Sequence, residues 1–234
     1  MAKGSLTSDG CCIAEGFHLL DEALRSTADV RAVVVNESAF EKLPDLPESI
    51  RMIGIPDPLF AGIASTETTQ GVITLLHLPK WEEMDLVKSH SLTIVLDGLQ
   101  DPGNVGTILR AAEAFGASGA VFGTGTARPE NPKTLRASAG SLFRVPFIQA
   151  ANWKPQTVRL FAAVPYTKGV TLAGDVDWTR SCGIIIGSEG RGISETYRDA
   201  EPVAIPTRAV ESLNAAVAAS ILLYEAHRQR TARR

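Results

Sequence analysis

A glycine-rich turn, IIIGSEGRGIS at residues 184–194, follows apolar residues that are typical of a buried strand. Gly187 would allow the chain to leave that strand sharply, and Gly190 and Gly192 would let backbone N–H groups approach a ligand closely. The spacing matches neither the dinucleotide-binding G-x-G-x-x-G nor the phosphate-binding G-x-x-x-x-G-K-S/T. No lysine follows the turn, and Glu189 would repel phosphate, so the turn favours a cationic or neutral ligand.

A second polar segment, residues 97–104, follows the apolar residues 92–96 of another expected strand. Its last residue, Asn104, is a good N-cap, and Arg110 would lie a little under two turns into the helix that follows. In open α/β sheets, ligands gather at the carboxyl ends of strands. The segment is therefore a candidate site, although a capped helix with a surface arginine explains the same pattern.

A third segment joins an expected short strand at residues 203–205 to the last helix of the chain. Pro206 has no N–H and suits the end of a strand, while Ser212 and Asn214 could each cap a helix built from small residues. Three such segments in one domain indicate a shared ligand site better than any one of them does.

The composition is ordinary for a soluble globular protein that buries a core. Of 234 residues, 44% are hydrophobic, and the mean hydropathy is +0.06. The formal charge of −3 does not indicate nucleic-acid binding, although a local basic face could provide it. Residues 227–234 form one local basic cluster, which is most simply the solvated end of a helix.

The cysteines and histidines argue against two kinds of site. Cys11, Cys12 and Cys182 are odd in number and form no C-x-x-C, which favours a reducing compartment over a disulfide scaffold or a zinc site. The four histidines are scattered, so we expect no metal. No signal peptide is expected, and the longest apolar run, near residues 215–224, is too short to span a bilayer. We therefore expect a cytoplasmic protein without membrane contact.

Helices and strands alternate along the chain in two series, which predicts an α/β protein of two domains. The first series occupies residues 1–79, the second occupies residues 91–234, and residues 80–90 are expected to link them. The expected helices span residues 15–26, 57–65, 105–115, 132–139 and 211–229, and the expected strands span residues 30–36, 51–55, 71–78, 92–96, 119–122, 159–164, 183–186 and 203–205.

In chain order, the three polar segments resemble the three motifs of SpoU-type RNA 2′-O-ribose methyltransferases, which belong to the SPOUT superfamily. The matching patterns are N-x-x-x-x-x-R at residues 104–110, I-G-S-E-G-x-G at residues 186–192 and I-P…S-L-N at residues 205–214. Residues 136–146 are also similar to this family, and the match extends over residues 92–229.

The resemblance implies a fold that periodicity cannot show. Family members have an α/β domain with a parallel sheet, in which the C-terminal helix threads through a loop to form a deep trefoil knot. Two such domains pair into a homodimer. Residues 10–78 resemble the ribosomal-protein-like RNA-binding domain that often precedes the knotted domain. Without the resemblance, a Rossmann-type sheet would be expected.

The resemblance also implies a cofactor, S-adenosylmethionine, and RNA as the partner. The sulfonium of this cofactor is cationic, which agrees with a glycine turn that has Glu189 and no lysine. The family motifs imply cofactor contacts from Thr124, Gly187, Ile205 and Leu213, catalytic or pocket-ordering roles for Asn104, Arg110, Glu189, Ser212 and Asn214, and RNA contacts from Arg136, Ser138 and Arg144.

The implied reaction transfers the sulfonium methyl to a ribose 2′-oxygen, and alignment of the reacting atoms lowers its barrier. The family assigns removal of the hydroxyl proton to the arginine of the first motif, which is Arg110 here. A guanidinium stays protonated at any ordinary pH. Arg110 either departs from that rule in its site or orients the hydroxyl and stabilises the developing oxyanion, which is the role we expect.

The chain departs from the family pattern in two places. It lacks the basic helix that commonly precedes the position of Glu15 and Gly16, so some of the RNA contact is either missing or supplied by the partner subunit. Thr207 and Ala209 stand where methionine and glycine are more usual after the third-motif proline, which changes the packing expected around the cofactor.

Two other functions compete with this one. An NAD-dependent oxidoreductase needs a G-x-G-x-x-G at the first strand–helix turn, which residues 98–106 do not supply. A catalytically inactive RNA-binding or ribosome-assembly factor is the alternative on the same fold, and the motif residues that this chain keeps favour an enzyme. Ribosomal RNA is favoured over transfer RNA because the first domain resembles a ribosomal protein. Methylation that confers antibiotic resistance would have the same sequence signature.

Overall fold

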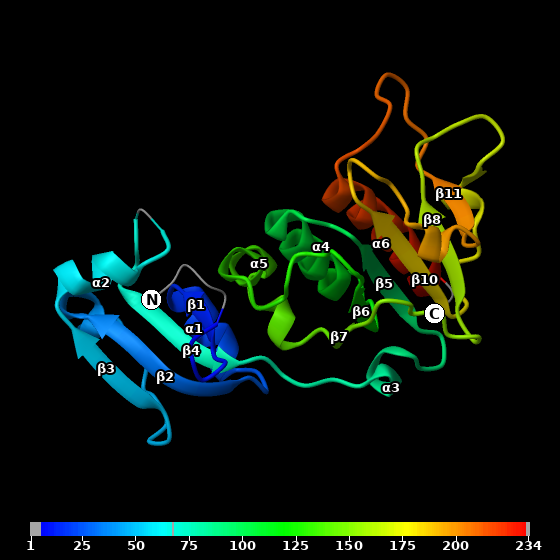
Figure 1. The fold of residues 1–234 in the computed structure, drawn as a ribbon. Coiled ribbons are helices and arrows are strands. Elements are labelled where there is room, and N and C mark those ends of the chain that lie inside the picture. The colour runs from blue at the N-terminus through cyan, green and yellow to red at the C-terminus, as the bar shows by residue number, and fades with distance from the viewer. Residues whose placement is uncertain (1–5, 67, 233–234) are drawn as a thin grey trace. The chain divides into compact units, whose positions relative to one another are not determined.

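A computed structural model describes residues 6–66 and 68–232 of the chain. Its contacts divide the chain into two compact units (Figure 1), each of which is described by itself. Unit 1 contains the residues up to Lys80 together with Arg128–Arg144, and unit 2 contains Trp81–Ala127 together with the residues from Val145 onward. Helices and strands alternate in both units, so the prediction of an α/β protein is confirmed.

Unit 1 is built on a four-stranded sheet. Its elements are β1 (Cys12–Glu15), α1 (Phe17–Leu24), β2 (Asp29–Asn36), the short helix η1 (Glu37–Lys42), β3 (Arg51–Ile55), α2 (Asp57–Ile63) and β4 (Val72–His77). The strand order is β1-β4-β2-β3, with β2 and β3 parallel and the other pairs antiparallel. Successive residues of β2 pack on opposite faces: Val33 joins the cluster of Leu20 from α1, and Val34 joins that of Phe60 from α2.

Two further elements of unit 1 come from a later part of the chain. α5 (Pro132–Ser138) and the short helix η2 (Ser141–Phe143) lie between strands of unit 2 in the sequence but belong to unit 1. α5 packs against β1, which is an edge strand of the four-stranded sheet. The domain bounds expected at residues 1–79 and 91–234 remain a prediction. The contacts differ from these bounds in one respect, because Arg128–Arg144 belongs to unit 1.

A seven-stranded parallel sheet forms the centre of unit 2. Its strands are β5 (Leu92–Asp97), β6 (Gly119–Phe122), β7 (Phe147–Gln149), β8 (Arg159–Ala163), β9 (Thr171–Leu172), β10 (Cys182–Gly187) and β11 (Glu201–Ala204), and its α-helices are α3 (Glu83–Leu86), α4 (Pro102–Ala114) and α6 (Ala215–Thr231). The strand order is β7-β6-β5-β10-β8-β11-β9, and every neighbouring pair is parallel. The parallel sheet implied by the family resemblance is confirmed.

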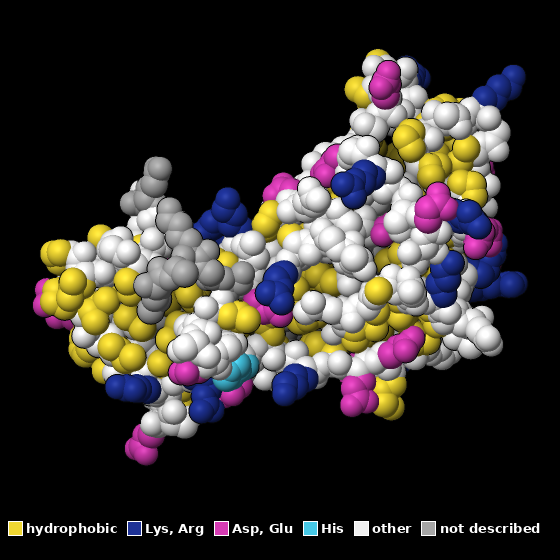
Figure 2. All heavy atoms as spheres, viewed as in Figure 1, with side chains coloured by type: hydrophobic (Ala, Val, Ile, Leu, Met, Phe, Trp, Pro, Cys, Tyr) yellow, Lys and Arg dark blue, Asp and Glu magenta, His cyan; other side chains and the backbone are white. Residues whose placement is uncertain are grey.

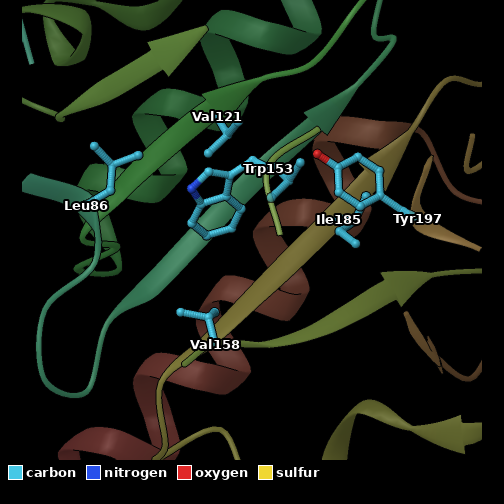
Figure 3. Close-up of a cluster of buried hydrophobic side chains, with 7 residues drawn as sticks. Leu86, Val121, Trp153, Val158, Ile185 and Tyr197 are labelled. Carbon is cyan, nitrogen blue, oxygen red and sulfur yellow. The ribbon is translucent and has the colours of Figure 1, made fainter. Parts of the chain in front are cut away.

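A hydrophobic cluster around Trp153 packs on this sheet, with Val121 from β6 and Ile185 from β10 (Figure 3). Leu86 of α3 belongs to the same cluster and is fully buried. α3 lies within the linker expected at residues 80–90, and its Leu86 is held in the core of unit 2. β5 is buried at every position, as expected for a central strand that is covered on both faces.

α6 packs against α4 and β10 with a face of small and apolar residues. The helix begins at Ala215, later than the expected residue 211, because Asn214 is its N-cap. Phe115, just after α4, meets Tyr224 of α6 edge-to-face, with ring centroids 5.6 Å apart. The buried residues of α6 are Ala215, Ala216, Ala219, Leu222, Leu223 and Ala226.

Arg230 near the end of α6 is held by backbone carbonyls. Its Nε donates to the carbonyl of Trp178 (2.8 Å), Nη1 to that of His90 (2.5 Å) and Nη2 to that of Arg180 (2.8 Å). The interpretation of the C-terminal basic cluster as a solvated helix end is therefore wrong for Arg230, which ties α6 to the segments that precede β5 and β10.

Candidate active site

β5 and β10 are neighbours in the sheet, and Asp97 at the end of β5 pairs with Gly187 at the end of β10. Because the strands are parallel, the chain leaves both of them at the same edge of the sheet. The polar segment at residues 97–104 and the glycine turn, although far apart in the sequence, therefore start side by side.

α4 starts earlier than expected. Asp101 is its N-cap and accepts a hydrogen bond from the N–H of Gly103 (2.9 Å), and Pro102 occupies the first helical position. Asn104 lies within the first turn, so the expectation that it caps the helix is wrong. The stronger signal was the Asp-Pro pair, because proline is favoured at the first position of a helix. The side chain of Asn104 is thereby available for other hydrogen bonds.

Three side chains, one from each polar segment, form a chain of hydrogen bonds. Asn104 donates through Nδ2 to Oε1 of Glu189 (2.5 Å), and Asn214 donates through Nδ2 to Oδ1 of Asn104 (3.1 Å). Asn214 also caps α6, because its Oδ1 accepts from the N–H groups of Ala216 (2.9 Å) and Val217 (3.3 Å). The structure therefore brings together three of the residues that the family motifs singled out.

We expect alanine substitutions at the two asparagines to differ in their effect on stability. Asn214→Ala removes a helix cap as well as a side-chain hydrogen bond, and it should lower the free energy of unfolding by about 1 kcal/mol. Asn104→Ala removes only partly exposed side-chain hydrogen bonds and should cost about 0.5 kcal/mol or less. Urea unfolding followed by circular dichroism measures both values. Equal losses would show that the cap on α6 adds nothing.

The glycine turn closes on itself. Ser188 and Gly192 form an isolated antiparallel bridge, in which the N–H of Gly192 donates to the carbonyl of Ser188 (2.8 Å). A Cβ on Gly187 would lie 2.3 Å from the carbonyl oxygen of Gly192, so only glycine fits there. A Cβ on Gly190, in contrast, would meet nothing within 4 Å. Gly187 is therefore required by the closure of the turn itself.

Asp97 is the last residue of β5 and is buried, whereas the sequence placed it in the polar segment after the strand. The residue is only 6% exposed, and its Oδ2 accepts a hydrogen bond from the N–H of Ser194 (2.7 Å) at the far end of the glycine turn. The carboxylate thereby fastens the turn to β5. The sequence analysis did not predict this role. The available signal was that the carboxylate directly follows the apolar residues of a buried strand.

A pocket lies beside the glycine turn in unit 2. Three of the four residues expected to bind the cofactor, Gly187, Ile205 and Leu213, line it, as do Glu189 and Ser212. Its other walls come mainly from the loop after β8 and from the first turns of α6. The glycine turn and the third polar segment therefore share one cavity.

The charge of this pocket fits a cationic ligand. Its lining includes the carboxylates of Glu189 and Glu211 and, within the described part of the chain, no lysine, arginine or histidine. A largely apolar wall with carboxylates suits a ligand that has both an apolar part and a positive charge, and it would oppose a polyphosphate. These residues fit S-adenosylmethionine, whose sulfonium is cationic.

Two expected site residues lie outside this arrangement. Arg110 is exposed on α4 and does not line the pocket. It follows Asn104 by six residues, which turns it about 240° around the helix axis, onto another face. Thr124, after β6, is exposed and does not line the pocket either. Its neighbour Thr126 orders this loop, because its Oγ1 accepts from the N–H of Gly98 (3.1 Å).

The three residues expected to contact RNA all lie in unit 1 and differ in exposure. Arg136 is exposed on α5. Ser138 is fully buried, and its hydroxyl donates to the carbonyl of Leu135 (2.8 Å), so this hydroxyl acts within the helix. Arg144 is exposed and pairs with Glu22 of α1.

The described residues form neither a metal-binding cluster nor a membrane-spanning helix. No group of three or more His, Cys, Asp and Glu side chains among them could hold a metal ion. In the same residues, every helix is too short or too polar to cross a bilayer. Cys11, Cys12 and Cys182 are buried, unpaired thiols, and burial raises the pKa of Cys12 to about 12.

A parallel α/β unit with an acidic pocket at a glycine turn has the features of a domain that binds a cationic cofactor rather than a phosphate. The chain belongs to the SpoU rRNA methylase family, whose model matches residues 91–224. Residues 7–74 match the MRM3-like substrate binding domain. The family resemblance inferred from the three motifs, and from the domain before them, is confirmed.

Relatives of known activity resemble most of the chain. The 23S rRNA (guanosine(2553)-2′-O)-methyltransferase RlmP of Bacillus subtilis (strain 168) is 32% identical over 231 residues, which are 95% of this chain and 90% of RlmP. The 23S rRNA (uridine(2479)-2′-O)-methyltransferase of Streptomyces viridochromogenes is 32% identical over 192 residues, which are 75% of this chain and 66% of that protein. The structure also resembles a crystal structure of the SpoU methyltransferase AviRb from Streptomyces viridochromogenes in complex with the cofactor AdoMet. The TM-score is 0.82 at 25% identity, and the match covers 98% of this chain and 96% of the AviRb chain.

Proposed function

We propose that this protein is an S-adenosylmethionine-dependent methyltransferase that methylates a ribose 2′-hydroxyl in ribosomal RNA. The observation that carries the proposal is the hydrogen-bonded chain of Glu189, Asn104 and Asn214 beside an acidic pocket, because it joins the three family motifs at one site. Two relatives are named as 23S rRNA 2′-O-methyltransferases, which favours ribosomal over transfer RNA. We also propose a cytoplasmic location, which the three unpaired thiols favour.

Different residues of this site would bind the cofactor and position the ribose. S-adenosylmethionine, when bound, supplies an electrophilic methyl group on a sulfonium sulfur. Backbone groups of the pocket-lining motif residues would hold the cofactor, and Glu189 would place negative charge near its cation. Asn104 holds Glu189 through a hydrogen bond and is itself held by Asn214, and this chain would restrict the direction from which a ribose can approach.

Arg110 would act on the ribose rather than on the cofactor. We assign to it the orientation of the 2′-hydroxyl and the stabilisation of the oxyanion that develops as the proton leaves. Arg110 does not line the pocket of its own chain, which supports an assembly in which a second copy helps to complete the site.

The exposed face of α6 is the surface that a homodimer would use. Val217, Ile221 and Tyr224 are four and three residues apart, so they share one face, and 47%, 38% and 53% of their surfaces are exposed. Pairing with the same face of a second copy would remove this apolar stripe from water.

Ile221→Glu should convert the dimer into a monomer, because a charge buried without a partner opposes association. Size-exclusion chromatography with light scattering measures the mass. Leu59→Glu makes the same change at a leucine of unit 1 that is 63% exposed, and it should leave the dimer intact. A protein that is monomeric before any substitution would refute the homodimer.

The deep trefoil knot is part of the same proposal. After β11 the chain passes the pocket and returns to the start of α4, where Asn214 meets Asn104, before α6 packs against α4 and β10. A helix that follows such a loop is placed to thread through it, which supports the knot.

Methyl transfer from labelled S-adenosylmethionine to separated ribosomal and transfer RNA tests the proposed reaction. Label should enter ribosomal RNA, and the labelled linkage should withstand alkali because a methylated 2′-oxygen cannot attack the adjacent phosphate. Label in neither RNA, with cofactor binding intact, would favour an inactive RNA-binding or ribosome-assembly factor on this fold. Label in transfer RNA alone would correct the substrate.

A further inference from the structure

Residues 1–80 are acidic, although they contain the domain that matches a substrate-binding model. They contain six Lys and Arg against eleven Asp and Glu. In the view of Figure 2, hydrophobic side chains gather over α2 and β3, and the exposed large hydrophobic residues of unit 1 include Phe40, Met52 and Leu59. Surfaces that hold a nucleic-acid backbone are basic. The overall charge of these residues therefore does not favour such a surface.

The excursion Arg128–Arg144 has the opposite charge and is fixed on the same unit. It contains four Lys and Arg against one Asp or Glu. α5 packs on β1, and at the other end of the excursion Arg144 pairs with Glu22 of α1. Gly140 has a φ of 91°, and a Cβ there would lie 2.7 Å from Cβ of Glu22. The backbone of the excursion is therefore seated closely against α1.

Three cations of this excursion face solvent. Arg128, Lys133 and Arg136 are exposed, whereas Thr134 and Leu135 on the other side of α5 are fully buried. Lys133 and Arg136 are three residues apart, so they are neighbours on one face of the helix, where like charges repel each other. In the described part of the chain, no carboxylate pairs with any of the three cations, so their charge is available to an external anion.

We propose that Arg128, Lys133 and Arg136 form the phosphate-contacting surface of unit 1, and that its partner is the backbone of RNA. The excursion, with four Lys and Arg against one Asp or Glu, supplies a positive balance that residues 1–80 lack. The inference rests on the proposed function, because that function makes RNA the substrate. Contacts to phosphate set affinity and salt dependence and read no base sequence.

A triple charge reversal, Arg128→Glu with Lys133→Glu and Arg136→Glu, tests this surface. Filter binding to protein-free 23S ribosomal RNA at a series of salt concentrations gives the slope of log Kd against log salt. Each lost phosphate contact lowers that slope by about 0.7 to 0.9, so the variant should lose about two to three units of slope. Its affinity at low salt should fall by at least about tenfold.

A second triple variant matches the charge change on another part of unit 1. Arg31→Glu with Lys42→Glu and Arg51→Glu reverses three exposed cations and should change the slope by less than about one unit. Both variants should bind S-adenosylmethionine as the unmodified protein does, which shows that unit 2 is folded, and circular dichroism checks unit 1.

An unchanged slope in the first variant, or an equal loss in both, would overturn the proposed surface. Failure of the proposed function has a different signature. The unmodified protein would then transfer no methyl group to RNA, while its binding to RNA could still depend on these three cations.

Discussion

Arg110→Ala is expected to slow methyl transfer by about a hundredfold to a thousandfold, which is the loss observed when one donor to a developing oxyanion is removed. Arg110 is exposed on α4 and lies outside the pocket lining, so its loss should leave both the fold and the affinity for S-adenosylmethionine intact. Transfer of labelled methyl to ribosomal RNA measures the rate, and calorimetric titration measures cofactor affinity. A rate that falls while affinity holds distinguishes an oxyanion stabiliser from a residue that binds the cofactor.

Arg110→Lys and the pH dependence of the rate separate stabilisation from proton removal. Lysine keeps the positive charge but lacks the planar guanidinium and its fixed pair of donors, so part of the activity should remain. If Arg110 only stabilises charge, the pH–rate profiles of both proteins should show the same limbs. A limb that is lost in Arg110→Lys would identify Arg110 as the base and contradict the stabilising role.

The strands that hold the site were predictable because their signals are local. β5 and β10 are apolar runs that end in polar segments, and their predicted bounds, 92–96 and 183–186, differ from the observed Leu92–Asp97 and Cys182–Gly187 by at most one residue at each end. Their adjacency depends on long-range pairing, which periodicity does not encode. The family resemblance supplied that information, and the hydrogen bonds of Asn104 then made the three motifs one site.

Other features were missed or mispredicted, and each miss has a physical reason. Asp97 was grouped with a loop because carboxylates are rarely buried, and the group that satisfies it, the N–H of Ser194, is distant in the sequence. α5 was expected at residues 132–139, but the unit on which it packs depends on a match of surfaces that the segment alone does not reveal. Asn104 has a strong capping propensity, which the Asp-Pro pair just before it overrides.

Gly187→Ala is expected to weaken the binding of S-adenosylmethionine by about a hundredfold. The added methyl carbon would lie 2.3 Å from the carbonyl oxygen and 2.4 Å from the carbonyl carbon of Gly192, and 2.8 Å from the backbone nitrogen of Ile193. All three are backbone atoms, so no side chain can yield and the turn must open. Overpacking of this kind costs up to about 3 kcal/mol. Where this free energy destabilises the cofactor-bound state, it raises Kd by roughly a hundredfold. Isothermal titration with the cofactor measures the loss.

Gly190→Ala is the matched control, because it adds the same methyl group to the same turn where nothing lies within 4 Å. Gly190 does not line the pocket, so affinity should change by less than about twofold. Gly190→Ala could instead weaken binding as much as Gly187→Ala does. The glycines would then be needed for the ligand to approach the backbone closely, as their spacing suggests, and not for the closure of the turn. If neither substitution weakens binding, the cofactor does not bind beside this turn. Comparison of the two variants, three residues apart, therefore shows whether the turn shapes the pocket or contacts the ligand directly.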